Sequence, residues 1–360
     1  MARRRLILVS LAAVALVAAG GYTALWLYAA HAVEGGLAQW TAAARAAGAN
    51  VEYGAPKLSG YPLALRLSVG SARVTAPHGL WRWSGDGLAA EVWPWAFRTV
   101  RIHPLGRQEA SFPFAGGTET VATQDESAEI VARFDPRGRF VEGTFDAARL
   151  SLAAVLVMPG GAASPAPAPI TAAGLHLGIA VPPPPATPPQ GPDLPPSLDL
   201  ELSAADLDFP AAASSPFGPH VSQLAATLQL MGRIEPGPPR AALAKWRDSG
   251  GTLEVRSLAL DWGPLGLSGN ATAALDAQLQ PEGAASTQIR GYRATIQALE
   301  ARGLIRPEAG SLLATFLTLM AKGQHNGDAS TLSVPLSIQH QRLYVGPFGL
   351  MNVPAIEWPQ

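Results

Sequence analysis

The seven histidines are the first side chains to consider for catalysis or metal binding. They are scattered along the chain, without an HExxH motif and without the paired spacing of zinc ligands. The sequence also lacks a G-x-S-x-G nucleophile elbow, a P-loop and a dinucleotide fingerprint. It therefore predicts a protein that is not an enzyme, with no catalytic residues, no metal site and no cofactor.

Two carboxylates and one polar turn are the remaining candidates for acid–base chemistry. Asp206 and Asp208 share the polar face of a predicted strand, but nothing nearby supplies the desolvated partner that a general acid needs. We interpret both as solvated surface residues. The segment 325–328, His-Asn-Gly-Asp, has the composition of a turn and is interpreted as one.

The most distinctive group is aromatic and indicates binding. An Asp86-Gly87 turn signal lies between two apolar arms, which predicts a hairpin. Its arms carry the candidate ligand-binding residues Trp81, Trp83, Trp93, Trp95 and Phe97. These side chains fit a hydrophobic sheet core, and they equally fit an apolar groove or a membrane-facing surface, because each of these demands one apolar face.

A rigid breaker precedes one well-defined strand. In the Gly-Tyr-Pro segment at 60–62, glycine permits unusual backbone angles, proline fixes its own φ, and the residue before proline is held extended. The alternation that follows predicts a strand with one buried face, and it comprises Leu63, Leu65, Leu67 and Val69. We interpret the breaker as a strand-initiation signal.

The N-terminus predicts an inner-membrane anchor. Arginines at 3–5 precede an uncharged run at 6–30, and about 20 apolar residues suffice to cross a bilayer. Trp26 and Tyr28 suit the membrane interface, and the positive-inside rule predicts a single pass with the N-terminus cytoplasmic and the body periplasmic. A cleaved signal peptide is the alternative, since small-residue sites at 13–15 and 30–32 fit loosely.

The charge and the cysteine content limit the partners and the kind of stabilisation that the chain can use. The net charge is −1, only 15% of the residues are charged, and lysine is nearly absent, which argues against nucleic-acid binding. The chain has no cysteine, so its fold does not rely on disulfides.

The remaining pattern predicts a mainly β fold with a few helices. Many short, half-buried strands with Gly and Pro punctuation favour an antiparallel, curved sheet, forming an open groove or a sandwich. We divide the chain into a transmembrane helix at 1–30, a helix plus a β-rich first half at 31–158, a proline-rich loop with one candidate short strand at 159–197, and a β-rich second half with helices at 198–360.

Amphipathic helices are expected to pack on this sheet. Apolar residues recur at spacings of four and three after the anchor, at Val33, Leu37, Trp40, Ala44 and Ala47. Three further helices are predicted in the second half, at 239–248, 292–305 and 308–322.

The order of several motifs resembles that of a known family. An arginine-flanked anchor is followed by "LSGYPLALRL", much later by "WRDSGGTLEVRSLALDWGPLGL" and "GYRATIQALEARGLI", and finally by "LSVPLSIQHQRLYVGPFGL". This order resembles domain-of-unknown-function family 2125, which comprises envelope proteins of Gram-negative bacteria. The resemblance implies a membrane-anchored, periplasm-facing, β-rich protein and supplies no catalytic residues. The layout is also similar to that of AsmA-like envelope proteins linked to lipid transport, although fold alone does not establish function.

Three functions are compatible with these observations. The leading hypothesis is a non-enzymatic envelope protein of the inner membrane that binds or shields a lipid, an acyl chain or another apolar ligand. The second is a scaffold or assembly factor that binds other envelope proteins. The third is a hydrolase whose site the motifs do not reveal.

Overall fold

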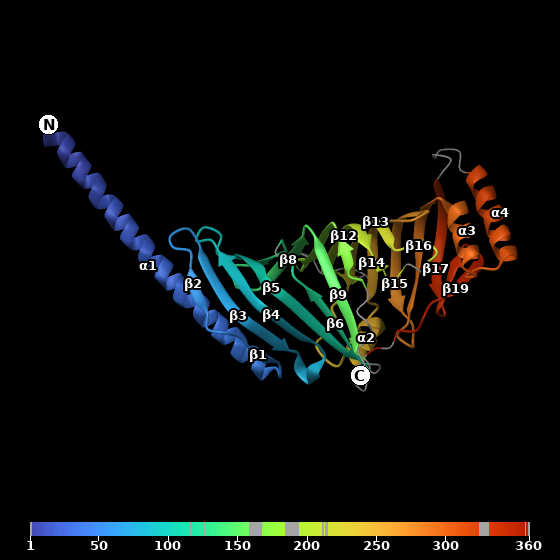
Figure 1. Cartoon of the computed structure of the whole chain (residues 1–360), viewed down its shortest axis with the longest axis horizontal. Coiled ribbons are helices and arrows are strands. Elements are labelled where there is room, and N and C mark those ends of the chain that lie inside the picture. Colours follow the sequence, from blue (N-terminus) through green and yellow to red (C-terminus); the bar gives the residue numbers. More distant parts are fainter. Residues whose placement is uncertain are drawn as a thin grey trace. The chain divides into compact units, whose positions relative to one another are not determined.

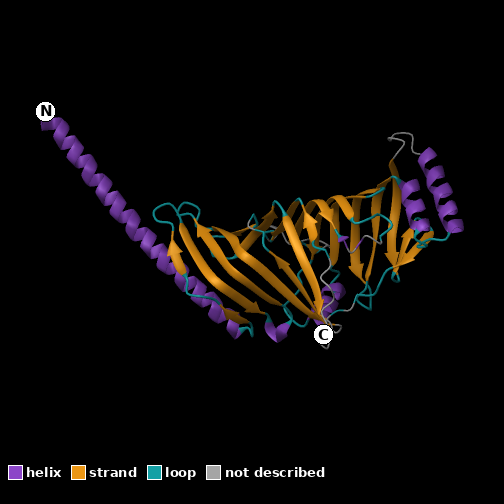
Figure 2. Ribbon diagram, viewed as in Figure 1, coloured by secondary structure: helices purple, strands orange, loops and turns teal. Residues whose placement is uncertain are grey.

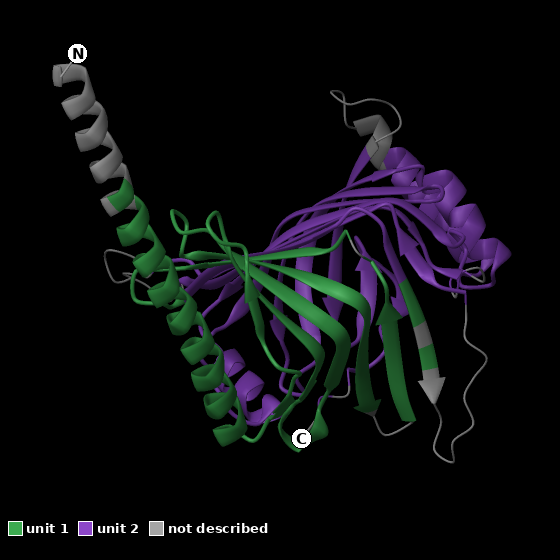
Figure 3. Ribbon diagram, turned by 60° about the vertical axis from the view of Figure 1, so that its left-hand side comes forward, with its two compact units in different colours: residues 1–139, 152–166 green, residues 140–151, 167–360 purple. Residues whose placement is uncertain are grey.

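The computed structural model describes an antiparallel, mainly β protein with helices at 2–46, 239–248, 292–301 and 307–323. It describes residues 2–114, 117–125, 127–157, 168–183, 194–210, 212, 215–323, 331–356 and 358. Two compact units make up the chain: the first comprises residues 1–139 and 152–166, and the second comprises residues 140–151 and 167–360 (Figure 3).

The first unit begins with a long helix, α1 (Ala2–Ala46). Trp26 and Thr41 are buried on its packing face, whereas Trp40 is 54% exposed. The predicted apolar stripe is therefore wrong at Trp40. Thr41, the next residue, lies on the buried side of the helix instead. Gly48 ends the helix with φ +88° and donates its backbone N–H to the carbonyl of Arg45 at 2.9 Å.

The predicted membrane anchor is not tested by these residues. Of the expected apolar run, the side chains of 6–15, 17 and 18 lie outside the described residues. No described helix combines the length and the apolar character that a membrane span requires.

The strands of the first unit form a meander beside α1 (Figures 1 and 2). β3 pairs with β1, β2 and β4, β4 pairs with β5, β5 pairs with β6 and β7, and β6 pairs with β9. Their bounds are β1 Asn50–Glu52, β2 Lys57–Ser59, β3 Leu65–Thr75, β4 Arg82–Val92, β5 Thr99–Phe114, β6 Gly117–Thr123, β7 Glu129–Phe134 and β9 Leu150–Val157.

The hairpin predicted at Asp86-Gly87 is wrong, because β4 runs straight through that position. The register shifts there, between Gly85 and Gly87, and the Asp86 carboxylate accepts a hydrogen bond from the backbone N–H of Arg107. A bulge absorbs the turn-forming residues without reversing the chain. The reversal between β4 and β5 lies instead at residues 93–98.

One face of this meander is apolar. Leu65 lies opposite Val92, which lies opposite Val100, so the three form a row across β3, β4 and β5. Leu65 and Leu67 are buried, as alternation predicts for the strand after the breaker. Leu63 precedes the strand and is exposed.

The second unit contains a longer antiparallel sheet, in which β8 pairs with β11 and the order then follows the sequence from β11 to β19. β10 (Ile170–Ala172) pairs at the end of β12. The bounds are β8 Phe140–Ala147, β11 Gly174–Ala180, β12 Pro196–Asp208, β13 His220–Met231, β14 Thr252–Trp262, β15 Leu265–Leu275, β16 Pro281–Arg290, β17 Thr331–Gln339, β18 Arg342–Val345 and β19 Phe348–Asn352.

Three helices accompany this sheet, close to the predicted positions: α2 (Pro239–Asp248), α3 (Tyr292–Ala301) and α4 (Pro307–Gly323). α3 and α4 lie side by side, with α4 against β17 and α3 against β15 (Figure 1). Ile296 from α3 and Leu317 from α4 pack with Leu332 and Val334, and Leu332 is 0% exposed. These residues form a buried core in the second unit.

Away from these helices, the same face of the second sheet is less covered. Leu200, Leu228 and Val255 form a row across β12, β13 and β14, and each is only half-buried. Leu177 on β11 lies opposite Leu202 and is exposed. The second unit therefore has an aliphatic sheet face that is partly accessible to solvent.

Candidate apolar binding groove

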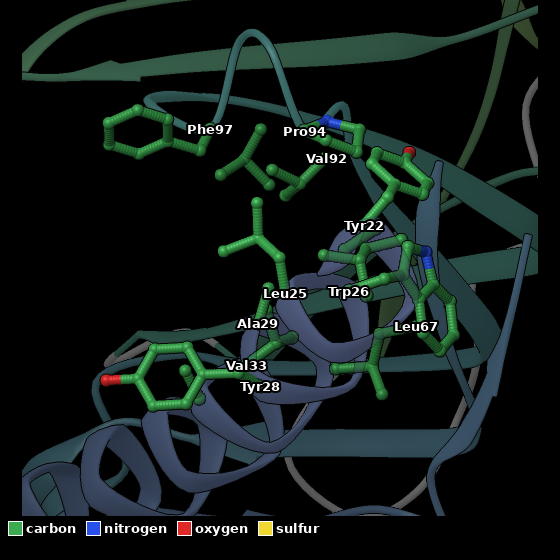
Figure 4. A pocket seen from close by; sticks show the side chains of 14 residues that line it. Tyr22, Leu25, Trp26, Tyr28, Ala29, Val33, Leu67, Val92, Pro94 and Phe97 are labelled. Carbon is green, nitrogen blue, oxygen red and sulfur yellow. The ribbon is translucent and has the colours of Figure 1, made fainter. Parts of the chain in front are cut away.

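An apolar groove of about 600 Å³ lies within the first unit, between α1 and the apolar face of β3, β4 and β5 (Figure 4). Among the described residues of its lining, the polar side-chain groups are the hydroxyls of two tyrosines and the indole N–H of Trp26. The lining consists of Tyr22, Leu25, Trp26, Tyr28, Ala29, Ala32, Val33, Leu65, Leu67, Ala90, Val92, Pro94, Phe97 and Val100.

The turn at 60–64 holds α1 against the sheet. The indole N–H of Trp26 donates to the carbonyl of Ala64 at 3.1 Å, and the Trp26 ring meets the Tyr61 ring edge-on, with centroids 5.5 Å apart. The hydroxyls of Thr23 and Tyr61 are 2.8 Å apart. A buried indole with a satisfied N–H fixes the helix at this point, so one wall of the groove is anchored.

The backbone conformation at residue 60 requires glycine at the first position of the breaker. Its φ is +98°, and its carbonyl accepts a hydrogen bond from the backbone N–H of Ala64 at 2.9 Å. A Cβ atom at this position would lie 2.6 Å from the Ala64 oxygen, so only glycine fits. The Tyr61–Pro62 peptide bond is cis, and the Pro62 carbonyl accepts a hydrogen bond from the Tyr22 hydroxyl. The segment thus enters β3 and also contacts the helix.

Three of the five aromatic candidates, Trp93, Trp95 and Phe97, lie in the loop between β4 and β5, and of these Trp93 and Trp95 do not line the groove. Phe97 lines the groove itself. Trp93 and Trp95 pack edge-on, with centroids 5.3 Å apart. Trp95 is 64% exposed and Phe97 is 67% exposed, so neither belongs to a closed core.

The other two candidates lie at the opposite end of β4. Trp81 directly precedes the strand and is exposed, whereas Trp83 is half-buried, opposite Val74 and Ala110. Neither lines the groove. The structure therefore does not bring the five aromatic residues together, because β4 is extended where a hairpin was predicted.

Sequence reasoning missed the wall that α1 contributes. Leu25, Trp26 and Ala29 were interpreted as part of an anchor, yet Trp26 and Leu65 belong to one buried cluster. No sequence signal joins these two positions. The alternation at Leu65 and Leu67 indicated a buried face, but it did not indicate what covers that face.

A charged network on the opposite face of the sheet positions Trp93. The Glu91 carboxylate accepts hydrogen bonds from Arg66 Nη2 and from the Trp93 indole, both at 2.6 Å. The hydrogen bond from Arg66, followed by that from Trp93, lowers the pKa of Glu91. The guanidinium of Arg101 lies 5.2 Å from the centre of the Trp93 ring.

The carboxylates considered for acid–base chemistry lie in the second unit, on the surface. His220 links them, with Nδ1 at 2.9 Å from Asp208 and Nε2 at 3.7 Å from Asp206. All three side chains are about half exposed or more, so solvent competes for each contact. The described residues contain no group of acidic residues and histidines that could hold a metal ion. The turn predicted at 325–328 lies outside the described residues.

These features define a mainly β protein with an apolar groove beneath its N-terminal helix. The chain belongs to the family described as an uncharacterized protein conserved in bacteria (DUF2125), which matches residues 26–354. The matched part begins at Trp26 and includes the turn at 60–64 and the loop at 93–98. No curated protein and no solved structure matches the chain.

Proposed function

We propose that this protein is a membrane-anchored, periplasmic envelope protein that binds an acyl chain of a lipid and catalyses no reaction. The groove beneath α1 is the observation that carries the proposal. Its volume of about 600 Å³ falls in the range of roughly 300–1,000 Å³ that is typical of ligand pockets. The anchor part of the proposal rests on the arginines at 3–5 and the uncharged run at 6–30.

The chemistry of the lining favours a hydrocarbon chain over a polar ligand. Ligand pockets usually add a few convergent polar groups that orient the bound molecule. In this groove the backbone of β3 and β4 is paired within the sheet, and the Tyr22 hydroxyl already donates to Pro62. A ligand that needs hydrogen bonds would lose them on entry, whereas an acyl chain loses none.

The second unit supports the same class of ligand independently. Its half-buried row of Leu200, Leu228 and Val255 is aliphatic, without the Tyr, Trp and Arg that enrich the centres of protein interfaces. Apolar surface of this kind gains free energy when hydrocarbon covers it, roughly 25 cal/mol per Å². We propose an open lipid-binding face there.

A scaffold role is the second candidate, and α4 favours it. Leu312 and Leu319 are both exposed on this helix, and a spacing of seven places them on one face. Such a stripe suits a groove in a protein partner. If this is the function, substitution of both leucines by serine abolishes partner binding and leaves lipid binding unchanged.

Two exposed alanines of α1 provide a matched test of the groove. Ala32 lines the groove, whereas Ala42 does not. We expect Ala32→Phe to fill the space and to weaken binding of a fluorescent fatty-acid analogue at least about tenfold, a change of about 1.4 kcal/mol. Ala42→Phe should bind like the wild type. If Ala32→Phe binds the analogue as tightly as Ala42→Phe does, the ligand does not occupy the groove.

A further inference from the structure

We infer that the rim of the groove rests on the surface of a phospholipid bilayer, so that the groove opens toward the membrane. This inference rests on the proposed anchor, and it adds a second membrane contact made by the folded body. Three elements form the rim: residues 25–28 of α1, the turn at 60–64 and the loop at 93–98.

The first argument is the exposure of large apolar side chains at this rim. Leu25, Tyr28 and Phe97 line the same groove and are all exposed, with the Phe97 side chain across the groove from α1 in Figure 4. Trp95 in the same loop and Leu63 in the neighbouring turn are exposed as well. Apolar side chains concentrated in this way mark an interaction surface.

The second argument is the type of residue. Trp and Tyr are the side chains that concentrate at bilayer interfaces, because each joins an apolar ring to a polar group. Trp95 and Tyr28 supply such rings on two different elements. At the bilayer interface the ring of such a residue contacts acyl chains while its polar group contacts headgroups or water, so Trp95 and Tyr28 fit that interface better than they fit bulk water.

The third argument is charge. Arg98 holds its guanidinium 5.3 Å from the centre of the Phe97 ring, and no carboxylate of a described residue lies within ion-pair distance of it. Arg101, in contrast, is paired with Glu129 at 3.5 Å. A guanidinium without an acidic partner among the described residues, next to exposed aromatic rings, fits the phosphate of a lipid headgroup.

The fourth argument is continuity with α1. The uncharged run that the anchor would use ends at residue 30, and the rim residues of the helix lie just before that end. About 20 residues of helix cross the hydrocarbon core, so a span that starts at Leu6 ends at about residue 25. The rim would then lie where the helix leaves the bilayer, and an acyl chain could enter the groove without crossing water.

Site-directed spin labelling of the full chain tests this inference, since the protein has no cysteine of its own. Trp95→Cys places a label on the rim. Trp40→Cys places one at an exposed position on α1 but outside the groove. Both proteins are reconstituted into vesicles of phosphatidylcholine with one-third phosphatidylglycerol, and collisions with oxygen and with a water-soluble nickel complex are measured.

We expect the label at 95 to collide more with oxygen than with nickel, and the label at 40 to show the reverse. Arg98→Glu in the Trp95→Cys background should shift the label at 95 toward nickel. Equal nickel access at 95 and 40 overturns the inference, and so does protection at 95 from both reagents, which indicates a protein partner. Fatty-acid binding by the same proteins separates the two proposals. If the protein binds fatty acid but the label at 95 is exposed to water, only the rim contact is refuted. If the label at 95 lies in the membrane but the protein binds no fatty acid, only the proposed acyl-chain binding is refuted.

Discussion

The helix coverings of the two sheets differ, although the sheet faces beneath them have the same aliphatic chemistry. In the second unit, α3 and α4 contribute Ile296, Leu313 and Leu317, and together they bury Leu332 completely. In the first unit, Trp26 belongs to one buried cluster with Leu65, whereas the larger α1 side chains Leu25 and Tyr28 line the groove but stay exposed. The pair of helices in the second unit fills the space above its sheet, whereas the large side chains of α1 other than Trp26 do not close the space above the first sheet.

This difference shows what decides whether an apolar sheet face is structural or available for binding. Alternation along a strand fixes which side chains share a face, and both sheets satisfy that pattern. The packing of the covering side chains then determines whether the space is filled. Truncation of a buried leucine in the second unit should therefore lower stability, whereas truncation of an exposed leucine in the first should mainly weaken binding.

The largest predicted effect contrasts Leu332 with Leu25. Leu332→Ala should lower the free energy of unfolding by about 2–5 kcal/mol, because a fully buried side chain leaves a cavity. Leu25→Ala should change it by less than about 0.5 kcal/mol, since Leu25 is exposed, while weakening fatty-acid binding. Urea unfolding, followed separately from binding, measures both. Similar losses of stability would show that α1 packs as tightly as α4.

The next prediction concerns the turn that holds α1. Gly60→Ala should destabilise the protein by about 1 kcal/mol or more, through positive φ and the close Ala64 oxygen. Gly79 is the matched control, because its φ is +69° and no atom lies within 4 Å of the position that a Cβ atom would take there. If Gly60→Ala and Gly79→Ala lower the free energy of unfolding in urea by the same amount, the close contact between residue 60 and the Ala64 oxygen does not contribute to stability.

The smallest effect is a pH dependence at Glu91. Because Arg66 and Trp93 lower the pKa of Glu91 in the folded state, ionised Glu91 stabilises the fold above the pKa of an unfolded glutamate, about 4.3. That contribution is lost as the pH falls through the lower folded value. Glu91→Gln should therefore flatten this acidic part of the stability–pH curve. A curve for Glu91→Gln that is parallel to the wild-type curve would contradict this role.

The sequence was most informative where a local rule decided the structure. The helix predicted at 239–248 and the alternation at Leu65 and Leu67 gave an element and a buried face correctly. The Asp86-Gly87 pair gave a wrong prediction, because a β-bulge and a hairpin turn favour the same residue types. Only the pairing of β4 with β5 shows that this position is a bulge.

The groove was beyond prediction for a different reason. Its walls meet through contacts such as that between Trp26 and Ala64, which are 38 positions apart, and no periodicity within either segment encodes such a contact. The aromatic residues at 93–97 were found as a group. That Phe97 lines a groove became visible only when the position of α1 was known.

Native mass spectrometry of the gently extracted full-length protein tests the central claim most directly. The account predicts that wild-type protein retains a lipid with acyl chains, and that Ala32→Phe loses it while Ala42→Phe keeps it. Folded wild-type protein that carries no lipid, or lipid retained equally by Ala32→Phe, would contradict the claim that the groove beneath α1 holds an acyl chain.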